Sequence, residues 1–207
     1  MNMRRSCLWI VAAVALAVSP FAAASGVLET ARELGTTTYR ASTWGSSGED
    51  AIDCVQFVLE VVKQVAADED RPDAVTPALK RALYIQLSEE DHANLQQMVD
   101  DGDPQITGVQ KALVDAGLGH PVAAEDAQPG DLVQYWYRSG GRWYGHSAIV
   151  EQIVDREATL YGSHKTTLQS ERHLERSERQ GGVGSGPVFD LTDPKRKVYV
   201  VRWIAPQ

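Results

Sequence analysis

The chain has 207 residues, of which 43% are hydrophobic and 23% are charged, with 17 Gly and 9 Pro. This composition is that of an ordinary globular protein, and it excludes low-complexity, fibrous and multiply membrane-spanning proteins. The 28 Asp and Glu outnumber the 20 Lys and Arg, so the net charge is -8. Phosphate backbones and anionic lipids repel an acidic protein, so we expect no nucleic-acid partner.

Residues 1–24 are predicted to be an export signal, with two arginines near the start, an apolar run over residues 8–18 and three alanines at the end. The apolar run is shorter than the ~20 residues that span a bilayer, so no stable membrane insertion is expected after cleavage. Cleavage after Ala24 removes two Arg and no acid, which changes the net charge from -8 to -10. Residues 25–207 are expected to form one exported domain, periplasmic or secreted.

A short helix, a loop and a buried helix are expected first in the mature chain. The helix covers residues 26–34, and residues 35–48 form a loop rich in Thr, Ser and Gly. From Val55 onward, apolar residues recur at helical spacing on more than one face, which predicts a central buried helix. Asp53 and Cys54 then lie in or just before its first turn, where unpaired N–H groups and the helix dipole favour an anion.

Residues 68–128 are predicted to be a helical insertion. Helices are expected over residues 77–87, after Ser88 with Asp91 as its capping partner, and over residues 107–116. Their apolar faces are expected to contribute to the core. The insertion is in a position to wall or cover a cleft.

After Pro129-Gly130 the apolar period changes to two, which predicts an antiparallel sheet and an α+β fold in which the helix at Cys54 packs on the sheet. The expected strands cover residues 131–137, 143–154, 158–164 and 197–204. Residues 171–186 combine a charged stretch with the sequence GGVGSG. This segment lacks the Lys-Ser/Thr and the helix of a phosphate-binding loop, so it is interpreted as a flexible connection.

Cys54 is the only thiol of the predicted mature chain, because Cys7 lies within the signal. In an oxidising compartment such a thiol is either buried as a small apolar side chain or retained for its chemistry. A cysteine nucleophile needs a base and a third group that orients the base. Of the five histidines, only His146 and His164 lie in strand-like apolar sequence, which makes them the candidates.

The two histidines are predicted to share one face of the sheet. If the turn between the second and third strands centres on Arg156, His146 lies opposite Thr166 and His164 lies opposite Ala148. The histidines are then diagonal neighbours, ~7–8 Å apart at Cα, within reach of a side-chain hydrogen bond. A shift of the register by one residue would place them on opposite faces.

Four short motifs occur in order between residues 39 and 150. They are Tyr39 followed by Trp44-Gly45, then DCVQFV from Asp53, PGDLVQYW from Pro129 and GHSAIV from Gly145. In this order the motifs resemble the NlpC-type bacterial cell-wall cysteine peptidases and amidases, which have the papain-like fold.

The resemblance implies that residues 25–207 form a papain-like hydrolase that cleaves an amide bond of peptidoglycan peptides through a thioester. Cys54 would be the nucleophile, His146 the general base and acid, and His164 the orienting group. A thiolate at a helix N-terminus beside an imidazolium has a lowered pKa, and the helix N–H groups can hold an oxyanion, in agreement with these roles. Gln152, on the same strand face as His146, is an alternative third residue.

Three residues are candidates for substrate binding. Tyr39 matches the tyrosine that lines the catalytic cleft of the family, and Trp44 is the aromatic residue expected to line a site. Asp53 is either a substrate contact or a helix cap. The family's Ser-Gly after the cysteine is replaced by Val55-Gln56, which alters the expected subsite for the substrate amine.

No metal and no cofactor is expected, because the sequence has no His-Glu-x-x-His, no Cys-x-x-Cys and no histidine pair at helical ligand spacing. Two alternatives to wall hydrolysis stay open. The first is a non-catalytic exported module that binds a cell-wall peptide or a partner protein in the same groove, which Val55-Gln56 motivates. The second is a papain-like amidase or acyltransferase that acts on another amide substrate.

Overall fold

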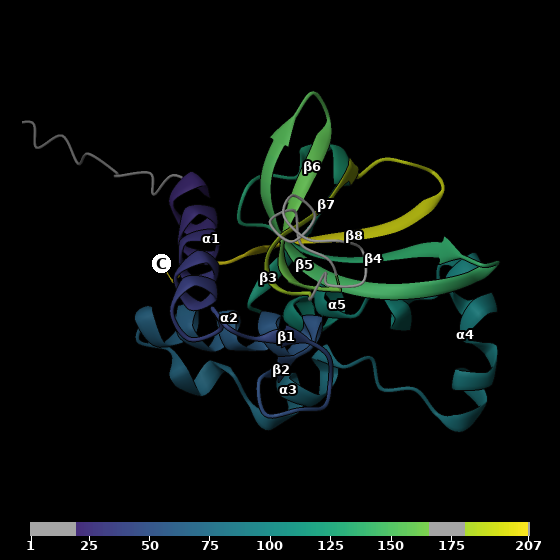
Figure 1. Cartoon of the computed structure of the whole chain (residues 1–207), viewed down its shortest axis with the longest axis horizontal. Helices are drawn as coiled ribbons and strands as arrows, with labels where there is room; N and C mark the ends of the chain where they lie inside the picture. Colours follow the sequence, from purple (N-terminus) through teal and green to yellow (C-terminus); the bar gives the residue numbers. More distant parts are fainter. Residues whose placement is uncertain (1–19, 166–180, 207) are drawn as a thin grey trace, which may run out of the picture.

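The computed structural model describes residues 20–165 and 181–206 and shows a mixed α+β fold (Figure 1). Its main sheet has six antiparallel strands in the order β3-β8-β4-β5-β6-β7, and a short parallel pair joins β1 to β2. The described helices are α1 (Pro20–Thr36), α2 (Cys54–Asp68), α3 (Pro77–Leu83), α4 (Glu89–Asp101) and α5 (Val109–Asp115). The described strands are β1 (Thr43–Trp44), β2 (Ala51–Ile52), β3 (Gly119–Val122), β4 (Leu132–Ser139), β5 (Arg142–Val154), β6 (Glu157–His164), β7 (Gly182–Asp190) and β8 (Arg196–Trp203).

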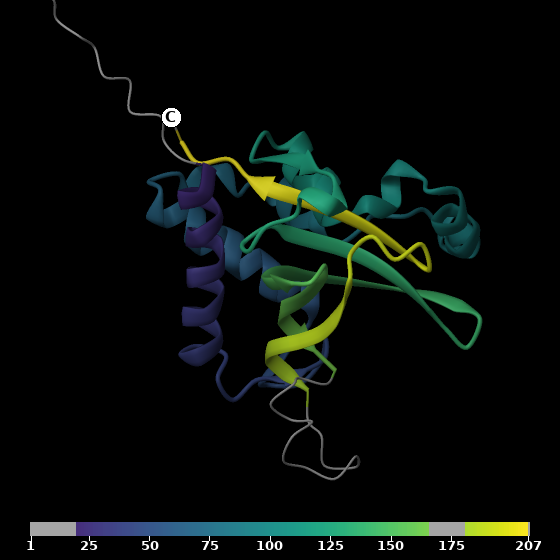
Figure 2. The same ribbon diagram turned by 90° about the horizontal axis from the view of Figure 1, so that it is seen from above.

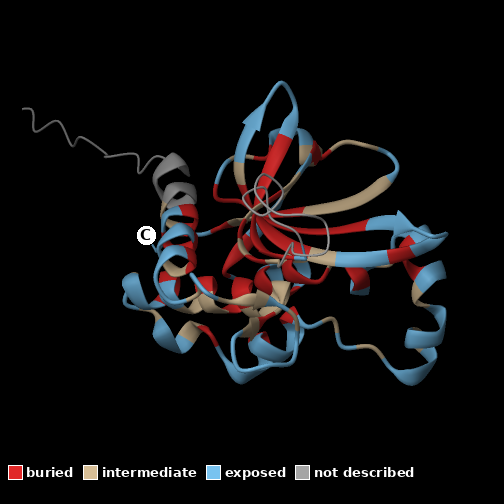
Figure 3. Cartoon of the chain, in the orientation of Figure 1, coloured by how far each residue is buried: buried red, intermediate tan, exposed pale blue. Residues whose placement is uncertain are grey.

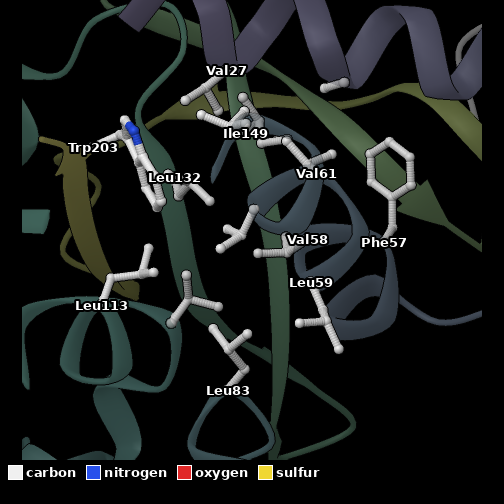
Figure 4. Close-up of a cluster of buried hydrophobic side chains, with 14 of the residues drawn as sticks. Val27, Phe57, Val58, Leu59, Val61, Leu83, Leu113, Leu132, Ile149 and Trp203 are labelled. Carbon is white, nitrogen blue, oxygen red and sulfur yellow. The ribbon is translucent and has the colours of Figure 1, made fainter. Parts of the chain in front are cut away.

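Helix α2 is central to the fold and confirms the predicted buried helix. It contacts α1 on one side and strands β5 and β6 on another. Val58 and Val61 are fully buried, close to Val27 of α1 and Ile149 of β5 (Figure 4). Each such side chain contributes roughly 1.5–3 kcal/mol when it leaves water. The start of α2, where Cys54 lies, is therefore held firmly against the sheet.

Helix α1 includes the predicted helix over residues 26–34, but it begins earlier, at Pro20, and ends at Thr36. Its described inner face is buried against α2 and includes Val27 and Ala31. The predicted cleavage site after Ala24 falls within α1, and residues 1–19 of the predicted signal lie outside the described residues. In the described ranges, none of the helices combines the length and the apolar character needed to cross a bilayer.

The insertion forms shorter helices than the sequence pattern predicts. Helix α3 ends at Leu83 rather than at residue 87, whereas α4 has the predicted capping box between Ser88 and Asp91. The predicted helix over residues 107–116 is shorter in the structure: Thr107 ends a 3-10 turn (Pro104–Thr107), and α5 begins only after Gly108, whose φ of 51° is left-handed. Helices α3 and α5 join the core as predicted, because Leu83 and Leu113 belong to it and α5 packs on β3, β4 and β8.

Helix α4 does not cover the histidines. It packs beside the distal part of the β4–β5 hairpin, at the opposite end of the molecule from α1 (Figure 2). There Met98 and Val99 form a small cluster with Trp136 and Trp143. Trp136 and Tyr135 are adjacent in β4 and point to opposite faces, so α4 lies on the face away from Tyr135 and its partner His146.

The predicted strands form β4, β5, β6 and β8, with end shifts of a few residues. Gly140 and Gly141, with φ of 58° and 80°, form the tight turn of the β4–β5 hairpin. Strand β3 lies within residues 68–128, which were predicted to be a helical insertion. The prediction of a flexible connection over residues 182–186 is wrong, since these residues begin β7 and pair with β6. The charged residues 171–180 lie outside the described residues.

The turn between β5 and β6 differs from the one predicted. Asp155 and Arg156, with φ of 50° and 75°, form a two-residue turn, and Val154 pairs with Glu157. This register differs by one residue from the expected one, which centred on Arg156 alone. By itself the change would place the two histidines on opposite faces of the sheet.

A β-bulge restores the shared face. Val150 pairs with Leu160 and Gln152 pairs with Thr159, so one extra residue, Glu151, lies in β5. On the side of the bulge that leads to His146, the register is changed by one more residue. Continued to the ends of the strands, it places His146 directly opposite His164 instead of diagonal to it.

Two layers of apolar side chains enclose the sheet. One lies between the sheet and helices α1, α2 and α5, and the other lies on the opposite face, between β4, β5, β8 and the strands β6 and β7. Figure 3 shows the buried residues concentrated where these elements meet, whereas α4 and the hairpin end are largely exposed. In β5, His146 shares its strand face with Ala148 and Val150 of the second layer, whereas Ile149 belongs to the first.

Candidate active site

His146 of β5 and His164 of β6 form a hydrogen-bonded pair. Nε2 of His146 lies 2.8 Å from Nδ1 of His164. The ring centroids are 5.0 Å apart and the ring planes differ by 31°. The contact that the sequence predicts between these two side chains is therefore present.

This hydrogen bond limits how the pair can carry protons. Only one of the two facing nitrogens can hold the shared hydrogen when both rings are neutral. If Nε2–H of His146 is the donor, Nδ1 of His146 is free to accept a proton, as a general base must. His164 then carries its hydrogen on Nε2, a buried atom without a hydrogen-bond partner among the described residues.

Burial lowers the pKa of both histidines, because a buried imidazolium loses hydration. The pKa of His146 falls from its usual 6.5 to about 4. The pKa of His164 falls to about 3, because of burial and of the nearby His146. Both rings are neutral at neutral pH, so His146 is available as a base.

Cys54 is the half-buried first residue of α2 and has no disulfide partner in the described part of the chain. Burial raises the pKa of its thiol, and the Asp53 carboxylate raises it further. Backbone hydrogen bonds from Ser147, and from Val55 and Cys54 itself, act in the opposite direction. The expectation of a lowered thiol pKa is therefore wrong for the resting site, because loss of hydration outweighs the helix N–H groups.

The Cys54 thiol lies beside the strand that carries His146. The thiol contacts the backbone of Ser147, which is the residue that follows His146. Across the described structure, no hydrogen bond joins the thiol to the ring of His146 or His164. Such hydrogen bonds are often long in unliganded enzymes and shorten when substrate binds.

Side-chain hydrogen bonds fix the segment around Cys54. Oγ of Ser163, next to His164, donates to the carbonyl oxygen of Ile52 at 2.6 Å, which ties β6 to the start of α2. Oδ1 of Asp53 accepts from the Gln56 N–H at 2.7 Å. Asp53 thus has the capping role that was one of its two predicted functions, and this cap orders the first turn of α2.

A cavity of about 580 Å³ opens beside the histidine pair. Its lining residues are Trp44, Tyr135, Tyr137, Ser139, Tyr144, Gly145, His146, His164, Lys165, Pro187 and Arg196. Trp44 is 43% exposed and lines the cavity, as expected for a residue at a site. Tyr39 is not among the lining residues, because its ring packs edge-on against Phe57 with centroids 6.0 Å apart.

Sequence reasoning missed several residues at this cavity. Tyr135 pairs directly with His146 across β4 and β5, and the ring centroids lie 5.4 Å apart. The register of the hairpin turn was sufficient to place this tyrosine on the histidine face. Arg196 pairs with Tyr137 at the start of β8, a contact between distant parts of the chain that no local pattern indicates.

Gln152, the alternative third residue, does not contact His146. It is exposed and lies beyond the bulge, and its amide donates to Oγ1 of Thr159 at 3.2 Å. Of the two candidates, His164 is the one that contacts the His146 ring.

Comparisons with known proteins assign no chemistry to this site. No family model matches the chain, and no curated protein or solved structure does so either. Within residues 20–165 and 181–206, no group of three or more His, Cys, Asp or Glu side chains is arranged to hold a metal ion.

Proposed function

We propose that this protein is an exported cysteine hydrolase that cleaves an amide bond in peptidoglycan stem peptides. The observation that carries the proposal is the 2.8 Å contact between Nε2 of His146 and Nδ1 of His164. When Nε2–H of His146 is the donor of this hydrogen bond, Nδ1 of His146 is free to act as a base. Cys54 lies at a helix N-terminus against the next residue of the same strand, Ser147.

The first half of the reaction forms a thioester. Nδ1 of His146 takes the proton of the Cys54 thiol while the sulfur attacks the carbonyl carbon of the amide. The N–H groups of Cys54 and Val55, which already contact the sulfur, are placed to stabilise the oxyanion. His146 then gives its proton to the leaving amine, and the C–N bond breaks. His164 holds the ring of His146 in orientation throughout.

The second half regenerates the enzyme. The neutral His146 takes a proton from water, whose oxygen attacks the thioester carbonyl. Collapse of the tetrahedral intermediate breaks the C–S bond, releases the carboxylic acid and returns the proton to the sulfur. Since burial raises the pKa of Cys54 and lowers that of His146, the resting pair is neutral, and the proton moves only when substrate is attacked.

A papain-like arrangement and a cell-wall substrate are the finer parts of the proposal. Their support is the order of the four motifs between residues 39 and 150 and their resemblance to NlpC-type enzymes. Export through residues 1–24 would bring the protein to peptidoglycan.

A non-catalytic binding module is the second candidate. Two observations favour it: the raised pKa of Cys54, and the lack of a thiol–imidazole hydrogen bond in the described structure. Such a module would hold its ligand in the cavity beside the histidines. A papain-like amidase or acyltransferase on another substrate would use the same three side chains as the hydrolase.

Mass spectrometry of fragments released from purified peptidoglycan by residues 25–207 tests the proposal. We expect new stem-peptide fragments with the unaltered protein and with His92→Ala, whose exposed side chain lies on α4. Cys54→Ala and His146→Ala should release none. A folded protein that releases no fragments but reacts with iodoacetamide would favour another amide substrate. A folded protein with an inert thiol would favour the binding module.

A further inference from the structure

The cavity beside the histidine pair carries positive charge in an acidic protein. Among the residues that the structure describes, Lys165 and Arg196 line it, and no Asp or Glu does. The chain as a whole has a net charge of -8. A concave site whose charge opposes that of its protein concentrates anions and repels cations.

Arg196 has hydrogen-bond donors available to a ligand. Its guanidinium lies 4.1 Å from the centroid of the Phe189 ring, which holds the side chain by packing. Its Nε is buried and has no hydrogen-bond partner in the described ranges. Asp193 forms an ion pair with Arg196, but its carboxylate oxygen stays 3.7 Å from this nitrogen, beyond hydrogen-bond distance, so the donor keeps no hydrogen bond. A buried donor without a partner costs free energy that a bound acceptor would restore.

A second cavity, of about 610 Å³, adjoins the first and shares Tyr137 and Arg196 with it. The other arginine in its lining, Arg138, is already engaged, because its Nη2 donates to both carboxylate oxygens of Asp100 at 2.6 Å and 2.8 Å. Arg196 is therefore the guanidinium with a free buried donor, and it lies where the two cavities meet.

We propose that Arg196 binds a carboxylate of the substrate, so that the site selects peptides with a free carboxylate close to the amide that is cleaved. A guanidinium presents its N–H groups in a planar fork that matches a carboxylate. Lys165 adds charge, and Tyr137 and Tyr144 line the same cavity. The inference rests on the proposed function for the identity of the substrate, whereas the anion site depends only on the cavity.

Binding to Cys54→Ala protein, which cannot turn substrate over, tests the inference by calorimetry. One probe is the peptide mixture released from purified peptidoglycan by a muramidase, and the other is this mixture with its carboxylates converted to carboxamides. We expect the carboxylate form to bind about tenfold more tightly, as one charged hydrogen bond provides. Introducing Arg196→Gln into the Cys54→Ala protein should remove the preference for the carboxylate form. Arg142→Gln should retain it, because this exposed arginine lies outside the cavity lining and loses the same charge.

Two further variants test the same preference if Arg196→Gln disturbs the packing of this side chain on Phe189. Arg196→Lys should lose most of the preference, because it keeps the charge and loses the fork, and Lys165→Gln should lose a smaller part. A short L-glutamate peptide and its glutamine counterpart show whether the carboxylate must come from a wall peptide. Equal binding of carboxylate and carboxamide forms would overturn the inference, as would a preference that survives Arg196→Gln. Carboxylate-dependent binding without any hydrolysis by the unaltered protein would retain the anion site and reject the hydrolase.

Discussion

Gly186 of β7 lies directly against the imidazole of His164. A Cβ atom at this position would be 2.2 Å from Cδ2 and 2.3 Å from Nε2 of the ring. On the other side, Nδ1 of the same ring is held by His146. The orientation of His164 is therefore set by a hydrogen bond and by the absence of a side chain at Gly186.

Gly186→Ala should displace His164 and lower activity. The added methyl group cannot fit beside the ring, so His164 must move away from His146 or β7 must move away from β6. A displacement of 1 Å near the reacting groups reduces rates by roughly 100-fold, so kcat should fall while KM changes little. The overpacked site should also lose about 1–3 kcal/mol of stability.

Gly26→Ala is the matched control for this experiment, because a Cβ at Gly26 meets nothing within 4 Å. It should leave kcat unchanged. Denaturation and steady-state kinetics measure both effects. A Gly186→Ala protein with normal kcat would show that the position of His164 does not matter for the reaction.

Local features of the fold could be predicted from the sequence because they depend on neighbouring residues. The caps at Asp53 and Ser88 and the Gly140-Gly141 turn are of this kind. The register between β5 and β6 is different, because it depends on the turn type and on the bulge at Glu151 together. The turn prediction was wrong by one residue and the bulge was not predicted, and together they shift the register by two residues, which keeps His146 and His164 on one face but makes them directly opposite instead of diagonal.

Strand β7 and the position of Arg196 in the cavity could not be predicted, because they depend on distant parts of the chain. A Gly-rich segment has low strand propensity, and it becomes a strand only because β6 pairs with it. Glycine is required at Gly182 because a Cβ atom there would lie 2.4 Å from the Ser42 carbonyl oxygen. Arg196 reaches the cavity only through the pairing of β8 with β4. The candidate triad and the cavity residue Trp44 could be proposed from the sequence, whereas the position of Arg196 could not.

The pH dependence of the reaction should reflect a neutral resting pair. We expect kcat/KM to rise through about pH 4, where His146 loses its proton and becomes a base, and to stay high at neutral pH. Because burial raises the pKa of Cys54, alkylation of the free enzyme by iodoacetamide should accelerate only as the pH rises above neutrality. Rapid alkylation in mildly acidic solution would instead indicate a preformed thiolate–imidazolium pair.

The stability of the protein should fall on acidification before its carboxylates are neutralised. The folded pKa values of His146 and His164, about 4 and about 3, lie below the unfolded value of 6.5. Between these limits the unfolded state binds more protons, so the free energy of unfolding decreases as the pH falls from 6.5. The slope reaches about 1.4 kcal/mol per pH unit for each histidine.

Urea denaturation between neutral pH and pH 4 measures this slope. Above the unfolded pKa the contribution of the two histidines should be constant. The double variant His146→Gln, His164→Gln should show a shallower slope over the same range. An unchanged slope in the double variant would mean that other groups cause the acid sensitivity.

Substitutions of Asp53 separate its capping role from the predicted substrate contact. Asp53→Ala removes the acceptor for the Gln56 N–H and should lower the free energy of unfolding by about 1 kcal/mol. Asp53→Asn keeps a capping oxygen and should retain most of this stability while it removes the charge. Ser88→Ala, which removes the equivalent cap of α4, should cost a similar stability and leave activity unchanged.

The activity of Asp53→Asn then decides the second role. If the carboxylate contacts a cationic group of the substrate, such as a free amine, KM should rise by about tenfold in a protein of near-normal stability. Removing the charge also lowers the pKa of Cys54, because Asp53 helps to raise it, so alkylation by iodoacetamide should become faster at a given pH. Normal KM together with faster alkylation would leave Asp53 as a cap that also keeps the thiol protonated.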